Sequence, residues 1–525
     1  MQDRRLIPRA FLFLLIAAPL SARQLATTAA ADSPDNPENV VTHHELRLPG
    51  RMLHYSATAG YIRLKDAEDK PRAKVFFMAY ALESENRDEP AATRPATQSS
   101  TEPYAQPSSR IDRPVTFVFN GGPGAASVWL HLGTAGPRRV AMPDDGSLPS
   151  PPYRLEDNPC TWLDFTDLVF IDPVGTGFSR AENPERAKEF YSVQGDIASV
   201  ADVIRLYLNQ SGRWLSPKFV AGESYGTTRA AGLSEQLNDR FGIAVNGIVL
   251  ISTVLNFQTL QFRPGNDTPY PLWLPSYTAV AHHHKKLPPE YQQMRLADLV
   301  EQVQRWAIEE YMPALMKGAD LDDDARRHVA RQLSRYTGLP IDYLEQANLK
   351  ISPGRFQKAL LRDQRRIIGR MDGRITAPDA DPLSDRPDFD PSMHGYFGIF
   401  STTFNDYVRR KLNFQTDLTY EFLTHTFDPG RDDREGYLDV SPALRSAMAK
   451  VPAMRVAVCS GWHDLATPFA AADYTINQLP LSRQQRRNIA HFYYDGGHMM
   501  YLNRASLAKL HDDLAGFYRS AVPPL

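Results

Sequence analysis

The stretch that decides the fold is Phe219-Val220-Ala221-Gly222-Glu223-Ser224-Tyr225-Gly226. Its apolar start is typical of a buried strand, and residues 227–237 behind it have the pattern of a helix. A serine in G-x-S-x-G between a strand and a helix is typical of a nucleophile elbow, a turn so tight that flanking side chains would clash. We predict that Ser224 is a nucleophile in a strained conformation, and that the Tyr225 amide faces the oxyanion of the reaction.

Short apolar runs bounded by turn residues recur on both sides of this motif. Continuous apolar runs, as opposed to alternating ones, suit parallel strands that are covered on both faces. The helical pattern over 196–208 places its apolar residues on one face. Strands that alternate with helices predict an α/β class with a doubly wound, mostly parallel sheet. The runs cover residues 115–119, 168–171, 219–221, 248–251 and 455–458.

A serine hydroxyl needs a base, and the base needs an acid that orients it. In α/β-hydrolases the acid and then the histidine follow the serine along the chain, each after a late strand. Asp464 follows the run 455–458, and His498 follows the apolar residues 492–494. Position and order therefore favour Ser224, Asp464 and His498 as a catalytic triad of the α/β-hydrolase fold.

Other interpretations of these residues exist. His463 and Asp495 are rival candidates, since they follow the same two strands. Asp464 could simply cap Thr467, and His498 could be an ordinary surface histidine.

A glycine-rich loop, Asn120-Gly121-Gly122-Pro123-Gly124, follows the run 115–119. It lacks the Lys and Ser/Thr of a nucleotide-binding loop. An α/β-hydrolase needs a second oxyanion N–H from a loop after an early strand, and glycine lets the backbone approach the substrate. Gly122 fits that position.

Together these motifs, with Asp172-Pro173-Val174-Gly175-Thr176-Gly177-Phe178-Ser179, resemble the serine carboxypeptidase family, and its bacterial branch in particular. The resemblance runs from about Tyr55 to the C-terminus and is weakest in the stretch 255–437. It implies a hydrolase that releases single residues from peptide C-termini and prefers acidic pH. It also implies Ser224, Asp464 and His498 as the triad, Gly122 and Tyr225 as the oxyanion donors, and Asn120 and Glu223 as the groups that bind the substrate carboxylate.

The implied role of Glu223 has a physical basis. A carboxyl group and a carboxylate that share a proton form a strong hydrogen bond, which is lost when the pH rises. The alternative is that the second elbow position tolerates any residue. Many family members also carry a glutamate partner in an E-x-G-P segment, where this chain has Thr134-Ala135-Gly136-Pro137, and this difference moves the expected pH profile. The family's cysteine after the glycine-rich loop is Ala125 here.

The N-terminal segment has Arg4, Arg5 and Arg9, then an apolar run over 10–20 and a stretch of small residues over 21–31. This pattern is typical of a secretory signal peptide, and the apolar run is shorter than the ~20 residues that a spanning helix needs. We therefore expect export to the periplasm or the outside, with no membrane anchor after cleavage. The predicted organisation is a signal peptide over 1–31, an α/β-hydrolase core over 32–254 with a disordered loop over 83–110, an inserted, mainly helical cap over 255–437, and the rest of the core over 438–525.

Composition limits the partners. The 525 residues carry a formal net charge of −2, which offers no electrostatic case for binding nucleic acid. The expected partners are peptides with a free C-terminal carboxylate, and the chain is expected to be a monomer or homodimer. His282-His283-His284 could bind a metal but is interpreted as a solvated segment of the cap, and the acidic run 320–324 lacks the glycine and terminal glutamate of a calcium loop. No cofactor and no metal are therefore predicted. The sequence leaves open whether Cys160 and Cys459 pair.

Two other functions use the same sequence features. An esterase or acyltransferase would form the same acyl-enzyme from an ester or pass it to an alcohol. A non-catalytic binding protein would retain the fold alone, although every triad position and both glycine motifs are present.

Overall fold

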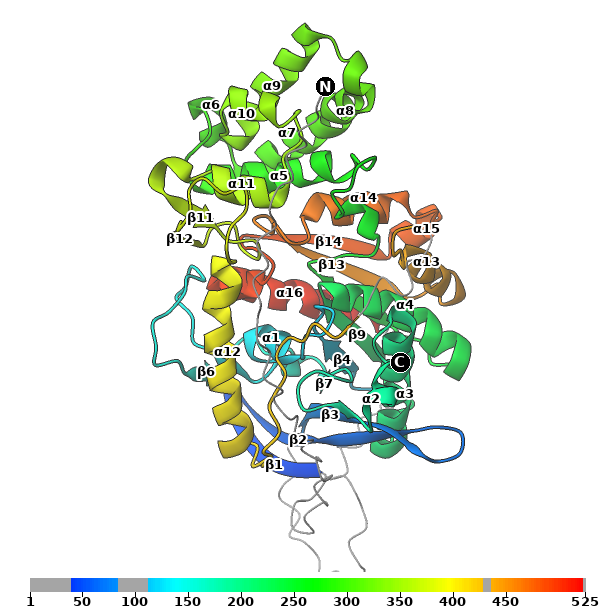
Figure 1. Ribbon diagram of the computed structural model, residues 1–525. Coiled ribbons are helices and arrows are strands. Elements are labelled where there is room, and N and C mark those ends of the chain that lie inside the picture. The colour runs from blue at the N-terminus through cyan, green and yellow to red at the C-terminus, as the bar shows by residue number, and fades with distance from the viewer. Residues whose placement is uncertain (1–38, 84–111, 428–435, 523–525) are drawn as a thin grey trace, which may run out of the picture. The chain divides into compact units, whose positions relative to one another are not determined.

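A computed structural model describes residues 39–83, 112–427 and 436–522, which belong to one compact unit (Figure 1). The predicted signal peptide and all but the first residue of the predicted disordered loop lie outside the described residues.

The core is a ten-stranded sheet in the order β1-β2-β3-β7-β4-β9-β10-β13-β14, with β8 paired to β3. Neighbouring strands from β7 to β14 run parallel, while β1, β2, β3 and β8 pair in antiparallel fashion at one side. The mostly parallel sheet with helices confirms the predicted α/β class. The strands are β1 Asn39–Leu48, β2 Arg51–Lys65, β3 Pro71–Leu82, β4 Val115–Phe119, β7 Asp167–Ile171, β8 Arg180–Ala181, β9 Lys218–Glu223, β10 Gly247–Ile251, β13 Arg455–Gly461 and β14 Ile489–Tyr494.

Helices cover both faces because each central strand is apolar on both. Phe219 and Ala221 of β9 face the core that contains α1, α12 and α16, whereas Val220 between them faces the core that contains α3, α4, α13 and α14. The helices of the first face are α1 Val128–Leu130, α12 Pro391–Arg410 and α16 Arg504–Ala521; those of the second are α3 Val193–Ser211, α4 Tyr225–Phe241, α13 Ser441–Lys450 and α14 Phe469–Gln478.

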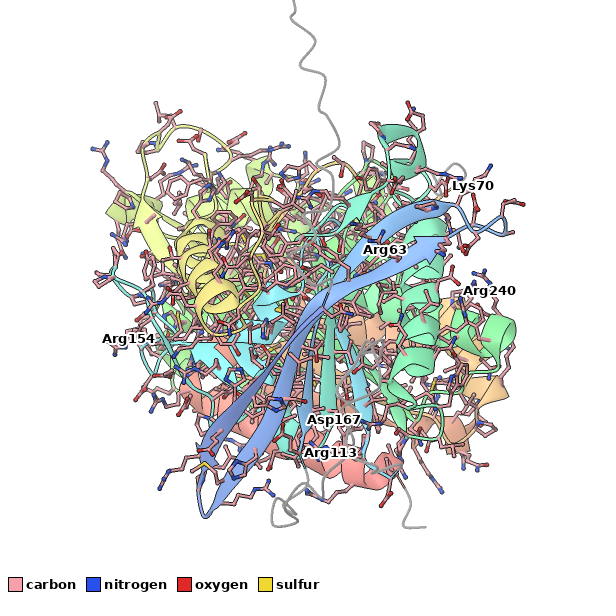
Figure 2. The ribbon with its side chains drawn as sticks, turned by 90° about the horizontal axis from the view of Figure 1, so that it is seen from below. Arg63, Lys70, Arg113, Arg154, Asp167 and Arg240 are labelled. Carbon is pink, nitrogen blue, oxygen red and sulfur yellow. The ribbon has the colours of Figure 1, made fainter. Side chains whose placement is uncertain are left out.

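The N-terminal end of strand β7 is held by a buried cluster of charges around Asp167, the first residue of this strand. Its carboxylate accepts a 2.7 Å hydrogen bond from Nε of Arg113 and another from Arg213. Arg113 and Asp167 are labelled side by side in Figure 2, which shows the molecule from below. Paired and hydrogen-bonded in this way, the buried carboxylate avoids the cost of an isolated charge.

The chain between β10 and β13 forms a group of helices that do not pack on either face of the sheet. Helices α5 to α11 pack around a separate apolar cluster that includes Trp273, Val303, Leu333 and Phe356 (Figure 1). Helix α12, in contrast, packs into the core of the sheet through Phe400 and Phe404. The elements are α5 Pro269–His283, α6 Pro289–Gln292, α7 Leu296–Trp306, α8 Met312–Lys317, α9 Asp323–Thr337, α10 Ile341–Gln346, α11 Pro353–Ala359, β11 Arg366–Ile368 and β12 Thr376–Pro378.

Two remaining expectations concern the cysteines and the membrane. Cys160 and Cys459 are both free thiols, so they do not pair. Within residues 39–83, 112–427 and 436–522, none of the helices is long and apolar enough to span a bilayer.

Candidate active site

Ser224 stands at the turn between β9 and α4 with φ 59° and ψ −129°. A positive φ is costly for a residue with a side chain, and such strain gathers at functional sites. The flanking glycines are required: a Cβ on Gly222 would lie 2.1 Å from the carbonyl oxygen of Gly226. A Cβ on Gly226 would lie 2.9 Å from the carbonyl oxygen of Phe119. The structure therefore has the tight elbow geometry that the G-x-S-x-G motif predicts.

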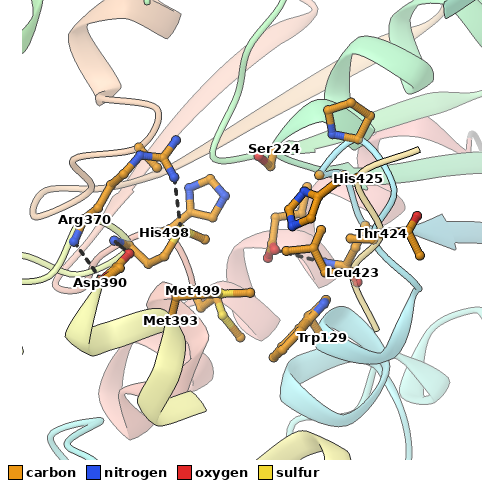
Figure 3. A pocket seen from close by; sticks show the side chains of 18 of the residues that line it. Trp129, Ser224, Arg370, Asp390, Met393, Leu423, Thr424, His425, His498 and Met499 are labelled. Carbon is orange, nitrogen blue, oxygen red and sulfur yellow. Dashed lines mark hydrogen bonds between the residues drawn. The ribbon is translucent and has the colours of Figure 1, made fainter. Parts of the chain in front are cut away.

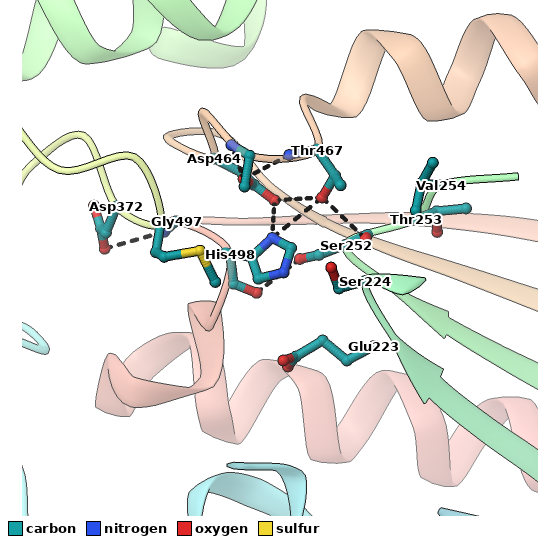
Figure 4. A network of polar contacts seen from close by, with 12 residues as sticks. Glu223, Ser224, Ser252, Thr253, Val254, Asp372, Asp464, Thr467, Gly497 and His498 are labelled. Atoms are coloured by element: carbon teal, nitrogen blue, oxygen red, sulfur yellow. Dashed lines mark hydrogen bonds and ion pairs between the residues drawn. The ribbon is translucent and has the colours of Figure 1, made fainter. Parts of the chain in front are cut away.

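Asp464 and His498 lie together at the carboxyl ends of β13 and β14. Oδ2 of Asp464 is 2.8 Å from Nδ1 of His498, and both side chains are 1% exposed. Figure 4 shows Ser224 near this pair, and both Ser224 and His498 border one pocket. The three predicted triad residues are thus brought to one site.

The alternative interpretation of Asp464 is also correct in part. Its carboxylate accepts hydrogen bonds from the backbone N–H groups of Ala466, at 2.7 Å, and Thr467, at 3.0 Å. The Thr467 hydroxyl donates a further one at 2.9 Å. Asp464 therefore caps its own loop and contacts the imidazole at the same time.

The protonation of His498 reflects two opposed influences. Burial lowers the pKa of His498, but the carboxylates of Asp464 and Glu223 outweigh burial and hold this pKa above its ordinary value. A buried imidazole whose cationic form is stabilised is suited to accept a proton from a hydroxyl.

The loop that carries His498 is held from outside the sheet. The His498 N–H donates a 2.6 Å hydrogen bond to the carbonyl of Met371, and the Gly497 N–H donates a 3.1 Å bond to Oδ2 of Asp372. Met371 and Asp372 belong to the loop between β11 and β12, which sequence reasoning did not single out. The Ser252 hydroxyl also donates to the carbonyl of His498 at 2.7 Å.

The rival residues lie elsewhere. His463 is 3% exposed, and burial lowers its pKa to about 3. Asp495 is 64% exposed and lies 3.4 Å from Arg374. Among the described residues that line the pocket with Ser224, neither His463 nor Asp495 is present.

The glycine-rich loop packs directly against the elbow. A Cβ on Gly121 would lie 2.4 Å from the backbone N of Tyr225, so the two backbones touch. Gly122 has φ +98° and borders the pocket. The loop thus brings its backbone beside the amide that follows Ser224, which is the placement that an oxyanion hole needs.

Glu223 is a buried acid beside the nucleophile, 4% exposed. Nδ2 of Asn120 donates a 2.9 Å hydrogen bond to its Oε1. The hydroxyl of Tyr501, in the short helical turn Met500–Leu502, donates a 2.6 Å bond to its Oε2. Burial raises the pKa of Glu223 to about 7, against the lowering effects of His498, Tyr501 and Asn120.

Tyr501 was not predicted from the sequence. Thr134 was expected to leave Glu223 short of a partner, yet the structure supplies this phenol instead. Thr134 itself is fully buried, and its hydroxyl has no hydrogen-bond partner within the described part of the chain. The only signal in the sequence was the proximity of Tyr501 to His498, and it does not specify a contact.

The pocket above Ser224 has a volume of about 500 Å³ (Figure 3). Its floor holds Asn120, Glu223, Ser224 and His498. Much of its wall comes from the chain between β10 and β13: Arg370, Met371, Asp390, Met393, His394, Leu423, Thr424, His425 and Phe427. The wall is apolar in large part, with a few charged groups, as small-molecule and peptide sites commonly are.

The other histidines predicted as solvated segments contact the backbone. Nε2 of His282 is 3.1 Å from the carbonyl of Gln292, and Nε2 of His284 is 2.8 Å from that of Gly373. No group of three or more His, Cys, Asp or Glu side chains arranged to hold a metal occurs in the described ranges.

A serine at a strained strand–helix turn, above a mostly parallel sheet covered on both faces, defines an α/β-hydrolase. Residues 99–257 match the model of the family described as serine carboxypeptidase, so this part of the chain is similar to that family.

Known relatives align over part of their length. "Serine carboxypeptidase-like 36" of Arabidopsis thaliana is 31% identical over 151 residues, which cover 27% of this chain and 29% of that protein. "Pheromone-processing carboxypeptidase KEX1" of Saccharomyces cerevisiae (strain ATCC 204508 / S288c) is 40% identical over 79 residues, or 15% of this chain and 10% of that protein. The chain thus spans less than a third of these curated relatives. The solved structure "Est816 as an N-Acyl homoserine lactone degrading enzyme" aligns with TM-score 0.35 and 13% identity, over 87% of this chain and 100% of that one.

Proposed function

We propose that the protein is an exported serine-type carboxypeptidase that releases C-terminal residues from peptides through an acyl-enzyme. The observation that carries the proposal is that one pocket joins Ser224 and His498 to the buried pair Asn120–Glu223. The first two supply acyl-transfer chemistry, and the last two supply a means to select a free carboxylate.

In the proposed mechanism, His498 takes the proton of Ser224 while Ser224 attacks the carbonyl carbon of the last peptide bond. Asp464 orients the imidazole and stabilises its cation. The N–H groups of Gly122 and Tyr225 stabilise the oxyanion. His498 then protonates the leaving amine and activates a water molecule, which releases the acyl group.

Substrate selection follows from the protonation of Glu223. Below its pKa of about 7 the carboxyl is protonated and can donate a hydrogen bond to the substrate carboxylate. Above that pH two buried anions would face each other, which is unfavourable. Hydrolysis of peptides should therefore weaken as the pH rises through 7.

The test compares three substrates that differ at one group: a blocked dipeptide, its C-terminal amide and its C-terminal methyl ester. The expected result is that kcat/KM for the dipeptide exceeds that for the amide at pH 5.5, and that the gap narrows at pH 8. Ser224→Ala should abolish turnover of all three. Ser446→Ala, in α13 and away from the pocket residues, is the matched control. Equal rates on dipeptide and amide at both pH values would contradict the carboxypeptidase proposal.

The esterase or acyltransferase is the second candidate, favoured by the largely apolar pocket wall. It predicts rapid turnover of the ester and none of the dipeptide. A binding protein that lacks activity would fail to react with a fluorophosphonate, whereas the proposed enzyme should be labelled at Ser224.

Export and organisation form part of the proposal. We expect the N-terminus of the mature protein between residues 23 and 32, in a periplasmic or extracellular fraction. Its measurement by N-terminal sequencing tests the signal peptide over 1–31. The pocket wall contributed by the chain between β10 and β13 supports the cap over 255–437, which lies between core parts 32–254 and 438–525. A mass measurement in solution distinguishes monomer from homodimer.

A further inference from the structure

Tyr501 lies behind Glu223 as seen from the pocket. Its side chain is fully buried, and it is absent from the residues that line the pocket, whereas Glu223 and Asn120 border it. Tyr501 therefore contacts Glu223 without a route to the substrate. Its hydroxyl donates a hydrogen bond of 2.6 Å to Oε2 of Glu223, at the short end of the usual range for bonds between oxygen atoms.

The ring of Tyr501 has a fitted place. It lies on Gly133, where a Cβ would come within 2.4 Å of its Cε2 atom. Gly133 belongs to the wide helical turn His131–Ala135, and no residue with a side chain could occupy that position without moving the ring. The phenol is thus positioned by packing as well as by its hydrogen bond.

Two donors consequently hold the two oxygens of Glu223. Asn120 donates to Oε1 from the glycine-rich loop, and Tyr501 donates to Oε2 from the turn after His498. Asn120 is itself fixed, because its Oδ1 accepts a 3.0 Å bond from the N–H of Leu130. Glu223 cannot rotate without losing one of these bonds.

We propose that Tyr501 is the positioning residue for recognition of the substrate carboxylate. Because a phenol and not a second carboxyl group holds Oε2, Glu223 is the single carboxylic acid of the site formed by Asn120, Glu223 and Tyr501. The proposal rests on the proposed carboxypeptidase function and deepens it. The groups that face Glu223 are Asn120, Tyr501, His498 and, at longer range, Asp464; Tyr396 faces Tyr501 in turn.

The phenol has the right chemistry for a constant donor. Burial, together with the charge of Glu223, holds the pKa of Tyr501 well above its ordinary value. The phenol therefore keeps its proton at every pH at which the protein is folded. A phenol that donates to Oε2 stabilises ionised Glu223 more than the neutral form. Its removal should therefore raise the pKa of Glu223 while it frees the carboxyl to rotate.

The experiment measures kcat and KM against pH for Tyr501→Phe with the blocked dipeptide and with its methyl ester. For the dipeptide at pH 5.5, KM should rise about tenfold with kcat little changed, because one hydrogen bond to an ionisable group is lost. The alkaline limb of kcat/KM should move to higher pH. KM for the ester, which has no carboxylate to recognise, should stay as in the wild type.

Three further variants test this interpretation. Tyr518→Phe removes a buried phenol that lies 2.8 Å from the Thr116 hydroxyl and does not border the pocket, so it should alter neither KM nor the alkaline limb. Gly133→Ala keeps the hydroxyl but displaces the ring, and should raise KM for the dipeptide in the same selective way. In a Glu223→Gln background, Tyr501→Phe should add much less than it does alone.

The possible failures are distinguishable. Wild-type enzyme that does not prefer the dipeptide to its amide overturns the proposed function, and the inference with it. A wild type with that preference, but an unchanged KM and alkaline limb in Tyr501→Phe, overturns the inference alone. If Tyr501→Phe and Gly133→Ala each lowered kcat/KM equally for the dipeptide and the ester, Tyr501 and Gly133 would have a purely structural role. That result would also overturn the inference.

Discussion

The backbone N–H of Ser224 donates a 2.9 Å hydrogen bond to the carbonyl of Ile251, the last residue of β10. This bond ties the elbow to the neighbouring strand at the point where φ is positive. The strain at Ser224 is therefore supported by the sheet, and it should appear in the stability of variants.

Ser224→Gly should be more stable than Ser224→Ala by about 1 kcal/mol, because glycine adopts a positive φ without strain and this gain exceeds its larger loss of chain entropy. Urea unfolding measures the difference. Ser446, within α13, is the matched control, since there glycine should be less stable than alanine by about 1 kcal/mol. The same order of stability at both positions would argue against strain at Ser224.

Asp464→Asn should lower kcat about 10⁴-fold, because an amide that donates toward Nδ1 favours the wrong tautomer of His498. The amide oxygen can still accept the N–H groups of Ala466 and Thr467, so the loop should persist. Steady-state kinetics and a thermal melt check both parts. The rival acid provides the control: Asp495→Asn should leave kcat within about twofold, and a loss as large as that of Asp464→Asn would refute our assignment of the triad acid.

Glu223→Gln should change how stability depends on pH. The pKa of Glu223 is raised from 4.5 to about 7 by burial, so the acid favours the folded state only while it is protonated. Wild-type stability is consequently lost as the pH rises from about 4.5 through 7. Relative to the wild type, the free energy of unfolding of Glu223→Gln should increase by about 2–3 kcal/mol between pH 5 and pH 8.

Denaturant titrations of both proteins at each pH give this difference directly. A gap that stays constant across that range would show that Glu223 does not titrate there in the folded protein.

Asp372→Asn should lower both stability and kcat. Buried Asp372 accepts a hydrogen bond from the Gly497 N–H and pairs at 2.7 Å with Arg374, which is largely covered. Weakening this pair should cost about 1–3 kcal/mol and, by loosening the loop of His498, lower kcat about tenfold. Asp379→Asn, which weakens the buried pair with Lys358 in the same part of the chain, is the control.

The control variant should lose stability without losing kcat. If the two variants lost kcat equally, the support of His498 by this loop would be refuted.

The sequence predicted the central sheet well because its strands are apolar on both faces. The runs 115–119, 219–221 and 455–458 lie within β4, β9 and β13, and the pattern over 196–208 lies within α3. The antiparallel side was predicted poorly. For this side the sequence predicts only two short strands, over 61–64 and 75–80, which lie within the much longer β2 and β3. Strand β1 was missed because its exposed and part-buried residues carry no apolar run.

The candidate site shows the same division. Residues with a motif, such as Ser224 and Gly122, could be predicted because a tight turn or a close backbone approach permits few residue types. Tyr501 and Asp372 could not, because their contacts depend on how distant segments pack. The amphipathic pattern over 296–311 predicts a single helix, but the structure has α7 over Leu296–Trp306 and then a wider helical turn over Ala307–Tyr311. The residue composition does not indicate this change of winding.

The loop between β11 and β12 limits how this protein could be recombined with similar proteins. Arg370 and Met371 border the pocket, while the Met371 carbonyl and the Asp372 side chain bind the backbone of His498 and Gly497. A chimaera that exchanged the whole stretch between β10 and β13 would replace one partner in each of these hydrogen bonds. The loop of His498 would then lose its support, and the histidine would be misplaced. Splice points that retain residues 369–375 with the sheet would allow the rest of the stretch to be exchanged, and substrate choice to be altered, without disturbing the reacting groups.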